Sequence, residues 1–217
     1  MSTLELFATL QREVHQESLG PGAFVLRHFA LLRDEALLEG IARVSELSPF
    51  RHMTTPGGFR MSVAMTNCGA LGWVTDHTGY RYAPLDPLSG EPWPPLPESF
   101  VELARNAAIA AGYSDFTPDA CLVNRYEPRA KMSLHQDKDE RDMSAPIVSV
   151  SLGLPAVFQF GGLERGDKPV RVPLDHGDVV VWGGPDRLRY HGVLPLKTGD
   201  HARTGRFRYN LTFRKAI

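Results

Sequence analysis

Residues 147–182 read IVSVSLGLPAVFQFGGLERGDKPVRVPLDHGDVVVW, a series of short apolar segments separated by glycine, proline and aspartate. Such a series is typical of strands joined by tight turns. From this stretch to the C-terminus we expect strands over 147–154, 157–160, 170–172, 178–182, 187–193 and 206–214. Many short strands in succession predict a sandwich or a jelly roll.

The chain before this stretch contains helical patterns. Asp34–Leu47 places its apolar side chains on one helix face, and Pro97–Ala111 starts with proline and ends before a glycine. Phe24–Phe29 is predicted as a strand, and the proline-rich segment 84–97 as a surface loop. The predicted fold class is therefore α+β, mainly β, in a single domain over 1–217 whose jelly roll is buttressed by N-terminal helices.

The composition is that of an ordinary globular protein, with 42% hydrophobic and 23% charged residues among 217. The net charge of −1 argues against a nucleic-acid binder that relies on bulk charge, although a local basic groove stays possible. Two cysteines cannot build a disulfide framework. The N-terminus has no basic region followed by an apolar one, and no apolar stretch could span a membrane, so we expect a cytoplasmic protein.

The segment 206–214, RFRYNLTFR, alternates strictly between polar and apolar side chains. One interpretation is an edge strand with a solvated polar face. The other is a polar face that lines a cavity, in which two arginines six residues apart bind the two ends of a dicarboxylate. Arginine suits that task because its planar fork forms two hydrogen bonds with a carboxylate. Composition alone does not choose between them.

Metal-ligand candidates occur as two His-x-Asp pairs, His135 with Asp137 and His176 with Asp178. In extended backbone both side chains of such a pair project to the same side. A distant histidine such as His191 would complete the two-His-one-carboxylate triad of non-haem Fe(II) enzymes. Either pair could instead be a plain turn, and the residues favour the first pair without excluding the second. A structural zinc site is disfavoured because it needs four protein ligands.

Several longer motifs resemble the AlkB family of Fe(II)/2-oxoglutarate dioxygenases. The resemblance runs from about Gly22 to Arg214, and the segments 55–58, 61–68 and 72–73 resemble the family's nucleotide-recognition lid. The motifs that carry it are NRY at 124–126, LHQDKDE at 134–140, SVSLGLP at 149–155, FQFGG at 158–162, HGDVVVW at 176–182, YHG at 190–192 and RYNLTFR at 208–214.

The resemblance implies a double-stranded β-helix core over about 119–217, preceded by an N-terminal extension over about 1–118 that carries the lid. It implies His135, Asp137 and His191 as ligands of Fe(II), and therefore as the catalytic residues, with O2 as the oxidant. It also implies a site for the cosubstrate 2-oxoglutarate formed by Asn124, Tyr126, Arg208, Asn210 and Arg214. In that case His176-Gly-Asp178 is a structural turn.

The implied activity is oxidative demethylation of N-alkylated bases such as 1-methyladenine and 3-methylcytosine in DNA, with RNA as a candidate second substrate, and with release of succinate, CO2 and formaldehyde. The methyl group lies on the pairing edge, so the base must leave the stack. Trp73 would stack on one side of the base and His135 on the other. The substrate residues implied by the resemblance are Thr55, Trp73, Tyr80, Arg81, Tyr82, Lys131, Ser133, Asp139 and Arg165.

The substrate class has alternatives. A 2-oxoglutarate oxygenase that acts on a protein or a small molecule would use the same iron site, and a non-catalytic jelly-roll module would use the same cavity. The expected partner is single-stranded or locally opened DNA, with RNA as a second candidate. We expect no membrane and no obligate protein partner, and the expected state is a monomer.

Overall fold

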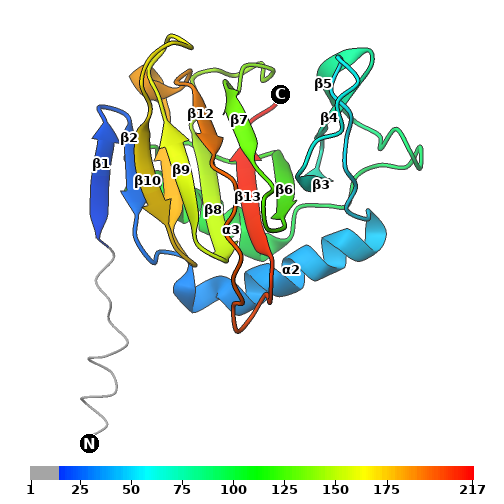
Figure 1. The fold of residues 1–217 in the computed structure, drawn as a ribbon, viewed down its shortest axis with the longest axis horizontal. Helices are drawn as coiled ribbons and strands as arrows, with labels where there is room; N and C mark the ends of the chain where they lie inside the picture. The colour runs from blue at the N-terminus through cyan, green and yellow to red at the C-terminus, as the bar shows by residue number, and fades with distance from the viewer. Residues whose placement is uncertain (1–14) are drawn as a thin grey trace, which may run out of the picture.

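The computed structural model describes residues 15–217. The first fourteen residues, where the sequence predicts no signal peptide, lie outside the described part. Two antiparallel sheets pack face to face, and a hairpin stands at one end (Figure 1). None of the helices in the described part is long and apolar enough to cross a membrane.

The larger sheet has the strand order β1-β2-β11-β8-β13-β6-β3. Strands from the N-terminal part pair directly with strands of the C-terminal part: β2 pairs with β11, and β3 pairs with β6. The bounds are β1 Gln16–Gly20, β2 Ala23–Leu26, β3 Ala64–Gly69, β6 Ala120–Tyr126, β8 Ile147–Gly153, β11 Val179–Trp182 and β13 Arg208–Arg214.

The smaller sheet has the order β10-β9-β12-β7, and β4 with β5 forms the separate hairpin. Their bounds are β4 Gly72–Asp76, β5 Gly79–Ala83, β7 Met132–His135, β9 Ala156–Phe160, β10 Val170–Leu174 and β12 His191–Val193. Together the larger and the smaller sheet form the double-stranded β-helix, or jelly roll, so the predicted fold class is confirmed.

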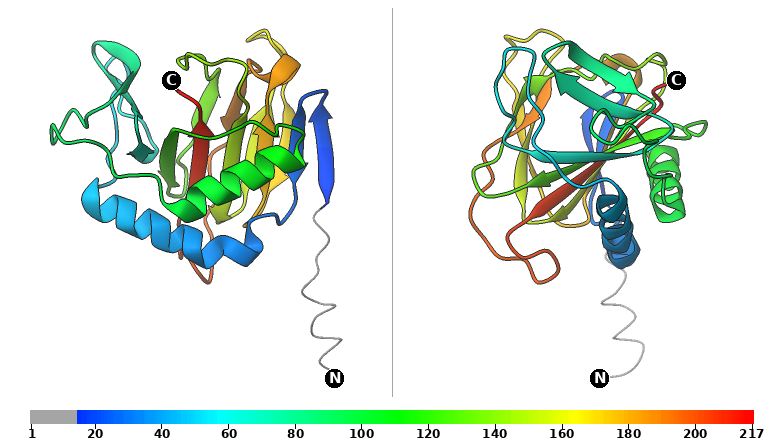
Figure 2. Two further views of the ribbon diagram at one scale, coloured as in Figure 1. Left: turned by 180° about the vertical axis from the view of Figure 1, so that it is seen from behind. Right: turned by 90° about the vertical axis from the view of Figure 1, so that its right-hand side faces the viewer.

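Two helices, α2 (Asp34–Leu47) and α3 (Glu98–Ala110), cover the outer face of the larger sheet (Figure 2). Side chains alternate across each strand, so one set packs against the helices and the other against the smaller sheet. In β13, Leu211 and Phe213 face the helix layer, whereas Ile147 and Trp182 of neighbouring strands belong to the apolar cluster between the sheets. Both helices agree with the sequence prediction.

Several sequence predictions differ from the structure at element ends. The strand predicted over 187–193 begins only at His191, because Gly184–Asp186 forms a 3-10 helix. The backbone N–H of Arg189 then donates a further turn hydrogen bond to the carbonyl oxygen of Asp186. The strand predicted over 24–29 ends at Leu26, since His28 takes a positive φ of 59°. The strand predicted from residue 206 begins at Arg208.

The edge-strand interpretation of 206–214 is wrong. β13 lies inside the larger sheet and pairs with β8 on one side and β6 on the other. Its polar residues Arg208, Asn210, Thr212 and Arg214 are all buried. They face the space between the two sheets, which places them beneath the candidate active site.

Candidate active site

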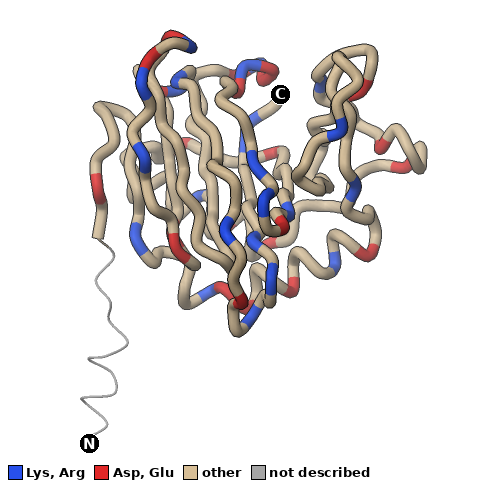
Figure 3. Tube along the Cα trace, viewed as in Figure 1, with Lys and Arg blue, Asp and Glu red and all other residues tan. Residues whose placement is uncertain are grey.

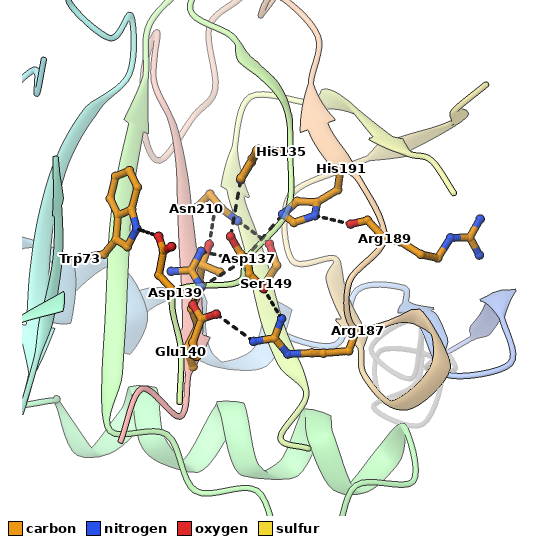
Figure 4. Close-up of polar contacts among 12 residues, drawn as sticks. Trp73, His135, Asp137, Asp139, Glu140, Ser149, Arg187, Arg189, His191 and Asn210 are labelled. Carbon is orange, nitrogen blue, oxygen red and sulfur yellow. Dashed lines mark hydrogen bonds and ion pairs between the residues drawn. The ribbon is translucent and has the colours of Figure 1, made fainter. Parts of the chain in front are cut away.

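Three potential metal ligands meet where β7 and β12 pair (Figure 4). His135 ends β7, His191 begins β12, and the two residues face each other in the antiparallel register. Nε2 of His135 lies 3.6 Å from Asp137 Oδ1, and Nε2 of His191 lies 3.7 Å from Asp137 Oδ2. The potential ligand atoms all lie within 4.8 Å of one another. Two imidazoles and one carboxylate that converge in this way match the facial triad of Fe(II) oxygenases.

Backbone carbonyls orient both imidazole rings. Nδ1 of His135 lies 2.9 Å from the carbonyl oxygen of Ser133, and Nδ1 of His191 lies 3.0 Å from that of Arg189. A carbonyl only accepts, so each neutral ring carries its proton on Nδ1 and keeps a lone pair on Nε2. Both Nε2 atoms are therefore prepared to bind a metal ion.

Charge at the site also favours metal binding. Burial would raise the pKa of Asp137, but Arg214 and the two histidines outweigh burial and hold that pKa below its usual value. Burial lowers the pKa of His191 to about 4, and the nearby His135 adds to that shift. Asp137 is therefore ionised and His191 neutral near pH 7, which are the protonation states that metal ligation needs.

The alternative pair His176 and Asp178 lies elsewhere and has structural contacts. Nδ1 of His176 accepts a hydrogen bond from the backbone N–H of Gly153, and its Nε2 lies 2.9 Å from a carboxylate oxygen of Asp34. Asp178 accepts hydrogen bonds from Arg27 and from the backbone N–H groups of His28 and Asp175. This pair fixes a turn, as the family resemblance implies.

An inner cavity extends from the triad into the space between the sheets. Arg208 is 1% exposed, and its Nε and Nη1 atoms have no hydrogen-bond partner among the described residues. Its Nη2 donates to Ser151 at 3.0 Å, and its guanidinium lies 4.9 Å from the ring centre of Tyr126. The cavity is lined by polar side chains that include Asn124, Tyr126, Ser149, Arg208, Asn210, Thr212 and Arg214.

A buried cation without an anion is costly, so this cavity fits an anionic ligand. Arg214 stands at the metal end, where its Nε and Nη2 donate to Asp137 Oδ2 at 3.0 and 2.8 Å. Arg208 and Arg214 leave β13 on the same face, six residues apart. The donor set therefore suits a dicarboxylate such as 2-oxoglutarate with one end beside the metal ligands.

A larger outer cavity of about 620 Å³ lies between the triad and the β4–β5 hairpin. Trp73 of β4 stacks on Tyr80 of β5, with ring centres 5.6 Å apart and planes inclined by 19°. The indole Nε1 of Trp73 donates to Asp139 at 2.9 Å (Figure 4). Of the predicted substrate residues, those that line this cavity are Thr55, Trp73, Tyr80, Lys131, Ser133, Asp139 and Arg165, together with His135.

Basic residues gather locally at this cavity, although both signs of charge are interspersed along the described chain (Figure 3). Arg60 and Lys138 line the cavity beside Lys131 and Arg165. Phe59, which is 76% exposed, also lines it. Arg60 and Lys138 are not among the predicted substrate residues, because no local periodicity in the sequence marks which side chains face the cavity.

Two predicted substrate residues are not among the side chains that line the outer cavity. Arg81 forms an ion pair with Asp76 of the same hairpin, 2.7 Å from Nη2 to Oδ2. The hydroxyl of Tyr82 donates to Glu140 at 2.7 Å. Alternation along β5 explains the position of Arg81, which points to the opposite side of the hairpin from Tyr80. Tyr82 shares the side of Tyr80, and its hydroxyl is bound to Glu140. Glu140 and its buried partner Arg187 are site residues that the sequence analysis missed.

A jelly roll that carries a two-His-one-carboxylate triad above a buried arginine defines a class of enzymes. Residues 22–214 match the sequence model of the 2OG-Fe(II) oxygenase superfamily. The chain is thus a dioxygenase that uses Fe(II) and 2-oxoglutarate. The ligand cluster fits Fe(II), and the free donors of the buried Arg208 fit a carboxylate of 2-oxoglutarate.

Within that superfamily the chain belongs to the AlkB family. It is 64% identical over 213 residues to the alpha-ketoglutarate-dependent dioxygenase AlkB of Salmonella typhimurium, with 98% of each chain covered. It is 34% identical over 134 residues to the human nucleic acid dioxygenase ALKBH1, covering 60% of this chain and 34% of that protein. The solved structure of OsALKBH1 superimposes with a TM-score of 0.79 at 31% identity, covering 93% of this chain and all of that one.

Proposed function

We propose that this dioxygenase removes N-methyl groups from alkylated bases in DNA, with RNA as a second substrate, and so repairs alkylation damage directly. In the overall reaction, 2-oxoglutarate loses CO2 and takes one oxygen atom of O2 to become succinate. The other oxygen atom converts the methyl group into a hydroxymethyl group. That group leaves as formaldehyde: the electron pair of the broken C–N bond stays on the base nitrogen, which becomes neutral, and the hydroxyl proton is released to solvent.

The observation that carries this proposal is the position of an aromatic pair above the triad. Trp73 and Tyr80 stack on each other at the outer cavity, which His135 and Asp137 also line. Stacking on an aromatic side chain stabilises a base by roughly 1–3 kcal/mol. A base flipped against Trp73 would bring its pairing edge toward the triad, where oxidation takes place.

His135, Asp137 and His191 would hold Fe(II), which with 2-oxoglutarate and O2 supplies the oxidising chemistry. Arg214 would bind the cosubstrate near the metal end, because it already contacts Asp137. Arg208 would bind the distal carboxylate, since it lies deeper and has free donors. The remaining cosubstrate contacts would come from Asn124, Tyr126 and Asn210, which line the same inner cavity.

The charge of the outer cavity suits methylated adenine and cytosine. Methylation at the pairing edge gives these bases a positive charge and weakens their pairing, so they cost less to flip. Asp139 lines the cavity and fixes the Trp73 indole through one carboxylate oxygen, which leaves the other available to a cationic base or its amino group. Thr55, Lys131, Ser133 and Arg165 would contact the flanking backbone.

The remaining substrate assignments follow from the family resemblance and the lid geometry. Arg81 and Tyr82 would support the lid rather than touch the base, because their polar groups are bound to Asp76 and Glu140. We infer that the protein acts as a cytoplasmic monomer on single-stranded or locally opened nucleic acid without an obligate partner. A net charge of −1 fits a protein that binds a few nucleotides rather than a long duplex.

The direct test is a single-turnover demethylation. The protein is loaded anaerobically with Fe(II) and 2-oxoglutarate and exposed to air with a single-stranded oligonucleotide that carries 1-methyladenine or 3-methylcytosine. We expect loss of the methyl group with formation of succinate and formaldehyde in equal amounts. Succinate without loss of the methyl group would contradict the nucleic-acid substrate and favour a protein or small-molecule substrate.

Trp73→Ala tests the stacking role. Loss of one base–aromatic stack should raise the KM for the methylated oligonucleotide roughly 5- to 150-fold, from about 1–3 kcal/mol of stacking energy. Succinate formation in the absence of oligonucleotide should persist, because Trp73 is not among the residues that line the inner cavity. Demethylation of the oligonucleotide and succinate formation without oligonucleotide are measured on the same preparation. Loss of both activities would show that Trp73 is a packing residue.

A further inference from the structure

The loop over 136–146 carries Asp137 but has no regular secondary structure apart from short turns. A metal ligand on such a loop needs side chains that fix it. Arg187 provides three contacts from outside the loop. Its Nη1 donates to the backbone oxygen of Asp137 at 2.6 Å, its Nη2 to Glu140 at 3.0 Å, and its Nε to the backbone oxygen of Ala145 at 3.0 Å. One buried guanidinium thus joins three points of the loop.

Glu140 extends these contacts to the triad and to the lid. One carboxylate oxygen accepts from Arg187, and the other lies 2.7 Å from the hydroxyl of Tyr82 and 3.3 Å from Nε of Arg214. Arg214 in turn donates two hydrogen bonds to Asp137 Oδ2. The Asp137 residue is therefore held from both ends, through its backbone oxygen by Arg187 and through its carboxylate by Arg214.

We propose that Arg187, acting through the Asp137 backbone and Glu140, is a positioning residue that sets the carboxylate ligand of the metal site. The Tyr82 hydroxyl joins the β4–β5 hairpin to Glu140, so the hairpin and the loop over 136–146 are both held by this carboxylate. This inference rests on the metal-binding role proposed for the triad and not on the identity of the substrate.

Arginine is required here because its planar guanidinium sends donors in three fixed directions. A lysine at this position would keep the charge beside Glu140 but could not reach the backbone oxygens of both Asp137 and Ala145 in the same geometry. The two charges are almost completely enclosed, with side chains 4% and 2% exposed. Partners that orient metal ligands typically change metal affinity 10- to 100-fold when they are replaced.

The test is the affinity for Mn(II), which accepts the same ligands and is measured by electron paramagnetic resonance on the full chain without nucleic acid. We expect Arg187→Lys to raise the Kd for Mn(II) by about 10-fold or more. The matched control is Arg27→Lys. Arg27 also contacts a buried aspartate, a second carboxylate and a backbone oxygen, but near the strand edge at β1 and β2. This control should lose thermal stability while its Kd for Mn(II) stays unchanged.

A second variant keeps the proposal testable if Arg187→Lys does not fold. Glu140→Gln preserves the shape of the side chain and removes its charge, and it should also raise the Kd for Mn(II). Wild-type Mn(II) affinity in either folded variant would overturn the proposal and leave the network a purely structural role. Normal Mn(II) binding by the wild type without oligonucleotide demethylation would instead contradict the proposed substrate. Absence of Mn(II) binding by the wild type would overturn the metal assignment on which both depend.

Discussion

Replacement of Asp137 by alanine is expected to reduce succinate formation more than 100-fold, with and without a methylated oligonucleotide. Asp137 is the carboxylate of the ligand cluster, and its loss leaves two imidazoles to hold the metal. Substitution of residues that merely support metal ligands already costs 10- to 100-fold. Because Asp137 is proposed to be a ligand itself, the effect of its removal should exceed that range.

Two further variants make this result specific. Alanine at 137 also leaves the buried Arg214 without its closest partner, which can lower the stability of the fold. Asp137→Asn keeps an oxygen that can accept from Arg214, and it should lose turnover as severely while it stays folded. Asp142→Ala removes a partly exposed aspartate of the same loop, whose hydrogen bonds from Ser144 are local, and its turnover should equal that of the wild type. Substantial turnover in Asp137→Asn would place the iron elsewhere.

The residues of β13 show how far the sequence could predict the site. Over 208–214, strict alternation predicted correctly which side chains share a face, whereas Arg206 lies outside the strand. It could not reveal that the strand lies inside the sheet, because that depends on pairing with β8 and β6, which are distant in sequence. The burial of this polar face, which we propose binds the cosubstrate, follows only from that pairing.

The choice between the two His-x-Asp pairs depended on tertiary structure for the same reason. Both pairs have the same local spacing, and they differ only in what the rest of the fold brings near. His191 comes to His135 through the β7–β12 register, whereas Asp34 comes to His176. The family resemblance implies the first pair, and in the described residues that pair converges with His191, whereas the spacing alone favoured it without deciding. The division of the chain near residue 118 stays a prediction.

Glu140 illustrates what the sequence concealed. It lies in the run Lys138-Asp139-Glu140-Arg141-Asp142, which is typical of a solvated charged turn. In the structure Glu140 is 6% exposed, because Arg187 and Tyr82 bind its two carboxylate oxygens from other parts of the chain. Such contacts span 47 and 58 residues, and no local pattern marks them.

Arg208→Met is expected to weaken 2-oxoglutarate binding roughly 30-fold or more, since truncating one member of a buried charge pair costs about 2–5 kcal/mol. Methionine fills a similar elongated space without the charge. Two of the three guanidinium nitrogens of Arg208 have no partner among the described residues, so their donors are free for a carboxylate. The measurement is isothermal titration calorimetry of 2-oxoglutarate in the presence of Mn(II).

Thermal unfolding gives an independent check of this prediction. A ligand that binds only the native state raises the melting temperature, so 2-oxoglutarate should stabilise the wild type and have little effect on Arg208→Met. Without 2-oxoglutarate the variant should be no less stable than the wild type, because it removes a buried charge that has no anionic partner. Arg206→Met, two residues earlier, removes an exposed arginine that pairs with Glu127 and should leave 2-oxoglutarate binding unchanged. Wild-type affinity for 2-oxoglutarate in Arg208→Met would show that the distal carboxylate binds elsewhere in the cavity.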